Sequence, residues 1–400
     1  MGVRPGYKLT EAGVIPEEWE LSTVGRQFSV QLGKMLDVDK NRGTHKPYIG
    51  NRHVQWGRFD LSDLPTIALT PEDLAKYRLV EGDLLVCEGG EVGRSAIWNG
   101  ADTDCYYQKA LHRLRPIGRL NTKVMLYLFE YLAATGSFAD FVTQTSIAHL
   151  PREKLVEVRI PLPSLHEQRA IAAALTAVDD LLASLDRLIA KKRAIKQGVM
   201  HDLLTGRKRL PGFSGEWEVQ ELRDLLRFQV GFPFRSQFFS AKPFGTRLVR
   251  NRDLKPNLDY LYYTGIYDNF FLIKNGDILI GMDGEFTTCV WKQGPALLNQ
   301  RVGRLNVGQH ASSLFLYYAL QDQLRLIEER TGATTVKHIS HSDIENINMP
   351  LPLRVEQIAI AAVLTDMDDE IDALQSRRDK THAIKQAMMA ELLTGRTRLI

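Results

Sequence analysis

Several features that define common protein classes are missing from this sequence. It has only three cysteines, Cys87, Cys105 and Cys289, with no CxxC pair and no Cys/His cluster, so neither a disulfide framework nor a zinc site is expected. No apolar run approaches the roughly 18 residues that a membrane-spanning helix needs, and no signal peptide opens the chain. We therefore expect a reduced, cytoplasmic protein that does not enter a membrane.

The common enzyme motifs are missing as well. There is no P-loop pattern (GxxxxGKS/T), no Asn-Pro-Pro-Tyr or Asp-Pro-Pro-Tyr, no GxSxG and no HExxH. A stand-alone Mg²⁺-dependent nuclease would need clustered carboxylates. The nearest candidates are Asp277, Asp283 and Glu285 in the second half and Asp83, Glu88 and Glu91 in the first. No Lys follows Glu285 at close spacing, so ordinary turn and loop carboxylates are the favoured interpretation.

Charge and length limit what can be expected of nucleic-acid binding and of the number of domains. Lys plus Arg number 51 and Asp plus Glu number 48, a net charge of +3, so a nucleic-acid surface would have to come from local segregation of charge. Two blocks are locally basic, Asp186–Arg209 and Leu225–Tyr260. A chain of 400 residues exceeds what one core normally supports, so we expect two to three domains.

One stretch occurs twice and fixes the organisation of the chain. The segment Pro161–Leu210 returns as Pro350–Leu399, 189 residues later and without a gap, and 27 of the 50 aligned residues are identical. Each copy follows a variable block of a different sequence. An internal repeat of this kind indicates two copies of one structural plan.

Both copies of the repeat carry the pattern of a long helix. Pro-Leu-Pro precedes each helix, and Gly206 and Gly395 follow Leu-Leu-Thr as stop signals. About 40 helical residues span roughly 60 Å. Apolar residues at steps of four and three form a heptad seam. The seam residues are Ile171, Leu175, Val178, Leu182, Leu185 and Ile189 in the first copy, and Ile360, Leu364, Met367, Ile371 and Leu374 in the second. We expect these two seams to pack against each other in antiparallel orientation, although the sequence alone leaves a parallel pairing open.

The variable blocks share a second set of phrases. Gly82-Asp83 and Gly276-Asp277 each open a predicted hairpin with a glycine-rich loop, in which Gly90-Glu91 matches Gly284-Glu285. A polar strand follows in each block (Tyr106–Leu114 and Leu298–Leu305), and we pair Gln108-Lys109 with Gln300-Arg301. Helical patterns cover Thr122–Ala134 and Ser312–Glu329. Each block therefore reads as a mixed, strand-led α/β module.

The polar residues of these modules suit contacts with DNA. Arg and Lys hydrogen-bond to guanine, Asn and Gln to adenine, and Glu to cytosine, whereas small polar loop groups suit phosphates. The base-reading candidates are Lys34, Asn51, Arg52, Glu91, Arg94, Gln108 and Lys109, and Arg235, Arg250, Asn251, Arg252, Glu285, Gln300 and Arg301. The phosphate candidates are Thr145, Ser146 and His149, and Thr334, Thr335, Lys337 and His338. His149 and His338 are related by the same offset as the helices.

These residues carry a family resemblance over essentially the whole chain. PLPSLHEQRAIAAAL and AIKQGVMHDLLTGRKRL, with their second copies, resemble the repeated helices of type I restriction–modification specificity subunits. NGDILIG, LNQRVGRL and GATTVKHIS resemble the target recognition domains of that family. The resemblance implies a non-catalytic subunit that reads an asymmetric, bipartite target in double-stranded DNA. It also implies that the helices set the spacer and bind two methyltransferase subunits, which restriction subunits join.

The expected architecture follows from the repeat and the resemblance together. Target recognition domains are expected at residues 1–160 and 211–349, and helical segments at 161–210 and 350–400. The fold class is α/β (α+β), with two globular domains joined by an antiparallel coiled coil in a pseudo-two-fold repeat. No cofactor is expected in this chain; S-adenosylmethionine, ATP and Mg²⁺ are expected on the partner subunits. The alternatives are a specificity subunit of a methyltransferase-only complex, a coiled-coil adaptor without DNA reading, and the nuclease above.

Overall fold

The protein is described by a computed structural model that covers residues 3–37, 39–100, 104–138, 143–144, 148–255, 259–330 and 337–399. Contacts within the chain divide it into two compact units. The first unit takes residues 1–186 and 376–400, and the second takes residues 187–375. This division cuts both long helices in the middle, so each unit contains one variable block and half of each helix.

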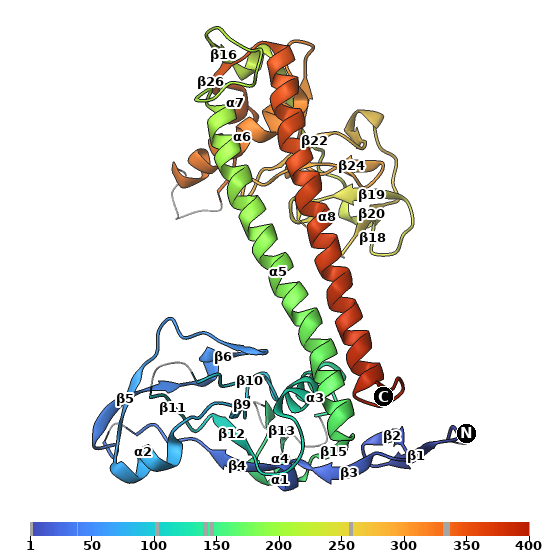
Figure 1. The fold of residues 1–400 in the computed structure, drawn as a ribbon. Helices are drawn as coiled ribbons and strands as arrows, with labels where there is room; N and C mark the ends of the chain where they lie inside the picture. The colour runs from blue at the N-terminus through green and yellow to red at the C-terminus, as the bar shows by residue number, and fades with distance from the viewer. Residues whose placement is uncertain are drawn as a thin grey trace. The chain divides into compact units, whose positions relative to one another are not determined.

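The repeated segments form the two long helices that the sequence predicts. Helix α5 spans Leu165–Leu204 and helix α8 spans Arg354–Leu392 (Figure 1). Short strands occupy the Pro-Leu-Pro phrases, β15 at Arg159–Leu162 and β26 at Asn348–Leu351. Gly206 and Gly395 follow the helix ends with φ of +71° and +69°. Glycine adopts this left-handed conformation without a Cβ penalty, which explains why both helices stop there.

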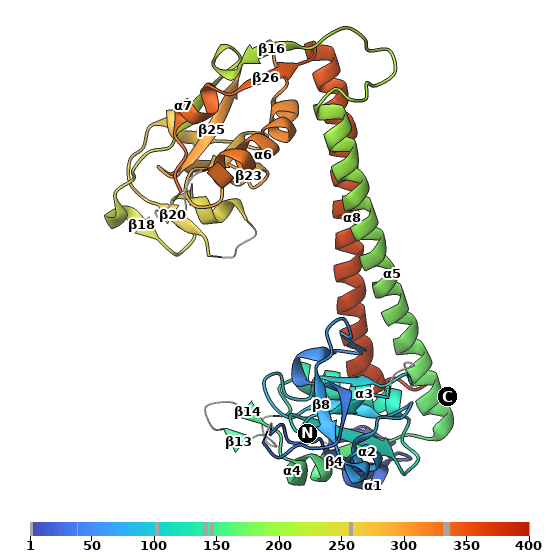
Figure 2. The same cartoon turned by 90° about the vertical axis from the view of Figure 1, so that its left-hand side faces the viewer.

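Within each unit the two helices run antiparallel and side by side (Figures 1 and 2). In the first unit Asp186 of α5 pairs with Arg378 of α8 at 2.8 Å, and Asp179 pairs with Lys385 at 2.8 Å. In the second unit Lys192 of α5 pairs with Glu370 of α8 at 2.6 Å, and Lys196 pairs with Asp368. Residue numbers rise along one helix as they fall along the other, which confirms the antiparallel orientation.

The expected pairing of the two seams is wrong in register. All of the predicted seam residues are buried or half-buried. However, Ile171 and Leu175 pack with Met389, Leu392 and Leu393 at the far end of α8, not with the seam of the second copy. The second seam likewise meets the other end of α5. Antiparallel helices bring the start of one beside the end of the other, so each seam meets residues C-terminal to the opposite seam.

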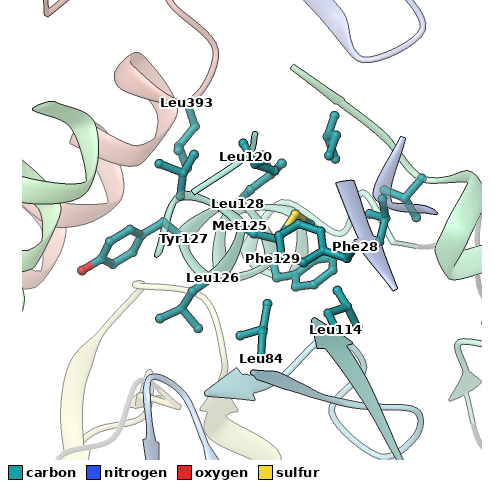
Figure 3. Close-up of a cluster of buried hydrophobic side chains, with 14 of the residues drawn as sticks. Phe28, Leu84, Leu114, Leu120, Met125, Leu126, Tyr127, Leu128, Phe129 and Leu393 are labelled. Atoms are coloured by element: carbon teal, nitrogen blue, oxygen red, sulfur yellow. The ribbon is translucent and has the colours of Figure 1, made fainter. Parts of the chain in front are cut away.

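A four-stranded antiparallel sheet forms the centre of the first unit. Its order is β10-β9-β12-β4, and helix α3 packs on it. The elements are β4 (Phe28–Leu32), β9 (Leu84–Cys87), β10 (Ser95–Ile97), β12 (Leu111–Pro116) and α3 (Thr122–Ala134). Figure 3 shows Met125 and Phe129 of α3 lying over Leu84 and Leu114 of the sheet. Leu392 at the end of α8 and Leu393 just after it join this core, so the helix end is packed into the unit.

A second, smaller sheet completes the first unit. Its order is β11-β5-β8, and the β11–β5 pair is parallel. The strands are β5 (Thr44–Ile49), β8 (Thr66–Leu69) and β11 (Tyr106–Tyr107). The remaining elements are β1 (Tyr7–Thr10), β2 (Gly13–Pro16), β3 (Glu20–Thr23), α1 (Val24–Gln27), η1 (Asn51–His53), β6 (Val54–Gln55), β7 (Arg58–Phe59), α2 (Pro71–Tyr77), β13 (Thr143–Gln144), β14 (Ala148–His149) and α4 (Arg152–Glu157).

The second unit repeats this plan. Its four-stranded sheet has the order β17-β25-β22-β23 and is covered by α6, and its five-stranded sheet has the order β18-β20-β19-β24-β21. The elements are β16 (Glu218–Glu221), η3 (Leu222–Asp224), β17 (Leu226–Val230), η4 (Ser236–Phe238), β18 (Phe239–Ser240), β19 (Thr246–Val249), η5 (Asn251–Leu254), β20 (Leu261–Tyr263), η6 (Asn269–Phe271), β21 (Leu272–Ile273), β22 (Ile278–Gly281), β23 (Thr288–Val290), β24 (Ala296–Leu298), β25 (Val302–Val307), α6 (Ser313–Arg330) and α7 (His341–Glu345). The predicted mixed α/β class with two long helices is confirmed.

One predicted element is broken in both units. The polar strand expected at Tyr106–Leu114 is two strands, β11 and β12, which belong to different sheets. The strand expected at Leu298–Leu305 divides in the same way into β24 and β25. The chain therefore leaves one sheet and enters the other through a short loop, residues 108–110 in the first unit and 299–301 in the second. Several candidate residues lie on these loops.

Repeated ion pairs fasten the helices to each unit. In the first unit Glu167, near the start of α5, is buried and accepts from Trp19 Nε1 at 2.8 Å and from Arg398 Nε at 2.6 Å. In the second unit Glu356, near the start of α8, is buried and accepts from Arg209 Nε at 2.5 Å. A buried carboxylate needs such partners because desolvation alone is costly. The repeated Glu-Gln phrase and the second arginine of each Thr-Gly-Arg-X-Arg phrase therefore connect the start of one antiparallel helix to the end of the other.

None of the helices in the described part of the chain is long and apolar enough to cross a membrane.

Candidate nucleic-acid interface

Four segments converge at the same place in each unit. In the first unit Asn51 of η1 donates to the carbonyl of Gly89 at 3.1 Å, in the loop after β9. The backbone N–H of Gln108 donates to the Ile49 carbonyl at 3.1 Å, and His149 of β14 bridges to Gly89. These bonds bring η1, the glycine loop, the 108–110 loop and β14 together, although they lie far apart in the sequence.

The second unit makes the equivalent contacts. Asn251 of η5 donates to the Asp283 carbonyl at 2.7 Å, in the loop after β22. The backbone N–H of Asn299 donates to the Val249 carbonyl at 3.2 Å, and His338 bridges to Asp283. The predicted correspondence of His149 with His338 is confirmed by these matching bridges. Both asparagines serve the same local purpose, because each one pins the glycine loop to the neighbouring 3₁₀ helix.

The structure corrects one predicted correspondence by a single residue. Gln108 occupies the position of Asn299, because each residue donates to the last residue of the parallel strand, Ile49 or Val249. Lys109 then corresponds to Gln300, and Ala110 to Arg301. The expected match of Gln108-Lys109 with Gln300-Arg301 was based on the likeness of their side chains. The backbone hydrogen bonds shift the correspondence by one residue.

Several candidates of the first unit are held by neighbouring side chains. Arg94 pairs with Glu91 at 3.2 Å and donates to the Asn51 carbonyl at 3.1 Å, which leaves its side chain 18% exposed. Glu91 also accepts from Trp56 Nε1 at 2.6 Å. Lys34 pairs with Asp73 at 2.8 Å. These contacts stiffen the loops and reduce the freedom of their polar groups.

The other candidates of the first unit are more open. Lys109 and Arg52 are exposed, and Arg52 makes a surface ion pair with Asp63 at 3.2 Å. Gln108 and His149 are half-buried beside the loops. Thr145 and Ser146 lie outside the described residues. The open groups are those that a polyanion or a base edge can reach.

The second unit carries more charge in the same place. Arg301 pairs with Asp283 at 3.2 Å, and Asp283 also accepts from His338 at 2.8 Å. Lys255 pairs with Glu285, and this hydrogen bond holds the pKa of Glu285 below its usual value. These loops therefore present donors, which base edges and phosphate oxygens can accept from, and also acceptors, which base edges can donate to.

The remaining candidates of the second unit differ in exposure. Arg250 pairs with the buried Asp253 at 2.9 Å, and this hydrogen bond raises the pKa of the arginine. Arg252 is exposed and pairs with Asp259 at 2.9 Å. Arg235 and Gln300 are exposed. Lys337 is half-buried near Glu328 at 3.7 Å, and Thr334 and Thr335 lie outside the described residues.

An open cavity of about 570 Å³ lies among these loops of the second unit. Its lining residues come from η5, the glycine loop, α6 and the segment before α7. They are Asn251, Arg252, Lys255, Asp283, Gly284, Glu285, Thr287, Glu328 and Lys337. The sequence did not single out Lys255, although it follows Arg252 by three residues and so extends the same basic stretch. Glu328 and Trp56 had no signal, since only the tertiary fold brings them to the loops.

Five of the six carboxylates that a nuclease would use face a cation. Asp277 pairs with Arg304 at 3.2 Å, and Asp83 pairs with Arg115 at 2.7 Å. Asp283 and Glu285 face Arg301 and Lys255, as described above. Among the described residues, no group of three or more His, Cys, Asp or Glu side chains is placed to hold a metal ion. The arrangement favours polar recognition by balanced charges.

Comparison with known proteins supports this interpretation. The family model described as the type I restriction modification DNA specificity domain matches residues 16–192 and again 214–381. The chain is similar to the type I restriction enzyme MjaVIII specificity subunit of Methanocaldococcus jannaschii, with 25% identity over 96% of this chain and 94% of that protein. The EcoBI specificity subunit of Escherichia coli is 34% identical over 42% of this chain and 36% of that protein.

The fold is also similar to solved structures. The S subunit of a type I restriction–modification system from M. genitalium matches with a TM-score of 0.61 and 17% identity, over 97% of this chain and 98% of that one. A chain from a structural study of complex assembly in the type I system matches with a TM-score of 0.60 and 18% identity, over 95% and 99% of the two chains. At this level of identity the likeness concerns the fold.

Proposed function

The chain belongs to the type I restriction–modification DNA specificity family, and from this premise we propose that each unit reads one half of an asymmetric, bipartite DNA target. The family makes the chain a non-catalytic DNA-recognition subunit. It does not favour the coiled-coil adaptor without DNA reading. Each unit supplies one target recognition domain, formed by the loops around Asn51 in the first unit and Asn251 in the second.

One observation carries this proposal: two identically built loop clusters display different side chains. The asparagine, the glycine loop and the histidine bridge recur in both units. The side chains on these loops differ, with Lys109 and Ala110 in the first unit where Gln300 and Arg301 stand in the second. Since base edges are distinguished by donor and acceptor patterns, different side chains on one scaffold should read different half-sites.

The long helices are proposed to set the spacer and to bind partners. Each helix is one continuous element of about 40 residues, which corresponds to roughly 60 Å. The repeated sequence gives the helices two equivalent surfaces, which fits two methyltransferase subunits, and restriction subunits would join that assembly. Asp180 and Asp369 lie at equivalent places on exposed faces of α5 and α8, and so do Lys191 and Lys380. Such repeated exposed groups are what two identical partners would contact.

The chemistry is assigned to these partners. We propose that S-adenosylmethionine is bound by the methyltransferase subunits, and that ATP and Mg²⁺ are bound by the partner subunits as well. The proposed place of action is the cytoplasm, where the DNA and the other subunits are present. The present chain contributes recognition of DNA through the loop clusters.

A matched deletion in both helices tests the spacer role. Removing residues 182–188 from α5 and residues 376–382 from α8 takes one heptad from segments that lie opposite each other. Seven residues correspond to about 10 Å of helix, or roughly three base pairs. The complex with its methyltransferase is expected to prefer a shorter spacer, by about this amount. The measurement is methylation of duplexes in which only the spacer length varies.

The control is a deletion in α5 alone, which breaks the register of the antiparallel pair and is expected to abolish assembly of the complex. A matched double deletion that assembles and still methylates the original spacer best would show that the helices do not set the spacing. Modification-sensitive sequencing of host DNA gives the reference motif and its natural spacer.

A further inference from the structure

Three side chains form a hydrogen-bonded group at the loop cluster of the second unit, in which two of them hold an arginine in place. The Nε of Arg301 lies 3.2 Å from Oδ2 of Asp283. The other carboxylate oxygen of Asp283 lies 2.8 Å from Nδ1 of His338. The side chains of Arg301 and His338 are 53% and 45% exposed, so the group lies at the surface with the carboxylate beneath it.

The geometry of this group leaves one edge of the guanidinium available. Asp283 takes the Nε side, and Nη1 of Arg301 is 3.5 Å from Nδ1 of His338, the outer limit for a hydrogen bond. The terminal N–H groups can therefore point away from the protein as a parallel pair of donors. This pair matches O6 and N7 of guanine, the two acceptors that this base presents in the major groove. A supported guanidinium also loses less conformational entropy on binding than a free one.

Other arginines of the second unit are used differently. Arg304 is largely buried and donates to Gln229, Asp277 and two backbone carbonyls. Arg250 donates to the buried Asp253. Their hydrogen-bonding groups are directed into the protein. Arg301 combines a fixed carboxylate partner with an exposed guanidinium on the loop between the two sheets.

The first unit lacks this group at the equivalent positions. Ala110 stands where the second unit has Arg301, and Gly89 stands where it has Asp283. The histidine position alone is kept, as His149. Neither alanine nor glycine can supply a donor pair or its support, so the group belongs to one half of the molecule only.

We propose that Arg301 reads a guanine in the half-site bound by the second unit, and that Asp283 is the positioning residue that orients it. The assignment rests on the proposed function, because it presumes that the loop cluster faces DNA. It specifies one base of one half-site and the side-chain pair that selects it. The first unit is expected to make no such contact from its 108–110 loop.

The test uses this chain in complex with its methyltransferase subunits, and duplexes that carry each of the four base pairs at every position of the second half-site. The wild-type complex is expected to prefer guanine at one position by roughly 5- to 150-fold, the range for a bidentate arginine–guanine contact. Arg301→Gln should abolish the preference at that position alone. Arg301→Lys should weaken it, because lysine donates as a point charge without the fixed fork.

Asp283→Asn tests the positioning role, because it keeps the size of the side chain and removes its charge. The preference at the same position is expected to fall while those at other positions and in the first half-site stay unchanged. Arg325→Gln is the matched control: it removes an exposed arginine that pairs with Asp322 and Glu329 on its own helix. It should leave every base preference unaltered.

The outcomes separate this assignment from the proposed function. A wild-type complex without any sequence preference would overturn both. A complex that reads a bipartite motif, but in which Arg301→Gln weakens binding equally for all four bases, would overturn the assignment alone and make Arg301 a phosphate contact. An Asp283→Asn complex with full guanine preference would remove the positioning role. Thermal unfolding of each variant shows that the changes in preference do not come from a loss of fold.

Discussion

Each unit has a structurally equivalent site in its core, and the two units fill this site with different pairs of side chains. In the first unit Val30 of β4 lies opposite Leu114 of β12, and the same strand carries the buried His112. In the second unit Phe228 of β17 lies opposite Leu305 of β25, and the position of His112 is taken by Gly303. A Cβ atom added to Gly303 would lie only 1.9 Å from the Phe228 ring.

This exchange shows how one backbone plan accepts two sequences. In one unit the site holds a small residue and a histidine, and in the other it holds a large aromatic ring and a glycine. The same space is therefore filled in both units. Protein cores are packed closely enough that an uncompensated change of this size is felt. At this site the fold is therefore maintained by two positions that differ together between the units.

The helices offer the strongest test of how alike the units are. Leu175 and Leu364 occupy equivalent places in α5 and α8, and both are completely buried in the core of their unit. Changing either leucine to alanine leaves a cavity and should lower the free energy of unfolding by about 2–5 kcal/mol. Hydrogen exchange should show Leu175→Ala acting on the first unit and Leu364→Ala on the second.

Leu188→Ala is the control on the same helix, since Leu188 is partly exposed and its loss should change stability by less than about 0.5 kcal/mol. Equal and large effects at Leu175 and Leu364 would sharpen the comparison by showing that both helices support their units to the same degree. If only one of the two variants is destabilised, the two units do not depend on their helices equally.

The matched core site is expected to give the next largest effect. Gly303→Ala forces a methyl group against the Phe228 ring and should cost about 1–3 kcal/mol. In a Phe228→Val background, which copies Val30 of the first unit, the same change should cost less, because the ring has been removed. Denaturant unfolding of the two single variants and the double variant measures this coupling. Additive costs would mean that the two positions do not compensate each other.

The comparison of the units also shows what the sequence could predict. The two long helices, their stops at Gly206 and Gly395, and helix α3 were predicted because periodic apolar residues and capping signals are local properties. The match of Gly82-Asp83 with Gly276-Asp277 was predicted for the same reason and is confirmed by matching turn hydrogen bonds. Because these local patterns occur in both halves, the prediction for one half supported the prediction for the other.

Non-local features were harder to predict. The seam of α5 meets residues such as Met389 because antiparallel packing depends on where each helix enters its unit, which the heptad pattern does not encode. The strand break before Leu111 depends on which sheet each half of that segment joins. The ion pair of Asp283 with Arg301 joins residues that only the tertiary fold brings together. Contact of the candidate residues with DNA stays a prediction.

The smallest expected effect concerns acid stability, which should separate the two units. His112 is fully buried, and burial lowers the pKa of its imidazole, while its Nε2 is 2.9 Å from the Leu150 carbonyl. The unfolded chain, in which a histidine has a pKa of about 6.5, then binds more protons than the folded chain. The free energy of unfolding should therefore rise with pH. The contribution of His112 is complete above about pH 6.5 and is lost as the pH falls toward the lower pKa of the folded state.

When the folded and unfolded states differ by one bound proton, the free energy of unfolding changes by at most about 1.4 kcal/mol for each pH unit. The effect is therefore best measured locally. Hydrogen exchange of β12 amides in the first unit, corrected for the intrinsic rate, should show openings that become easier between pH 7 and pH 5. The amides of β25 provide the internal reference, because Gly303 replaces the histidine there. His112→Gln should make the two strands respond alike. If the difference between the strands persists in that variant, the acid sensitivity comes from another group of the first unit, and the buried histidine is not its cause.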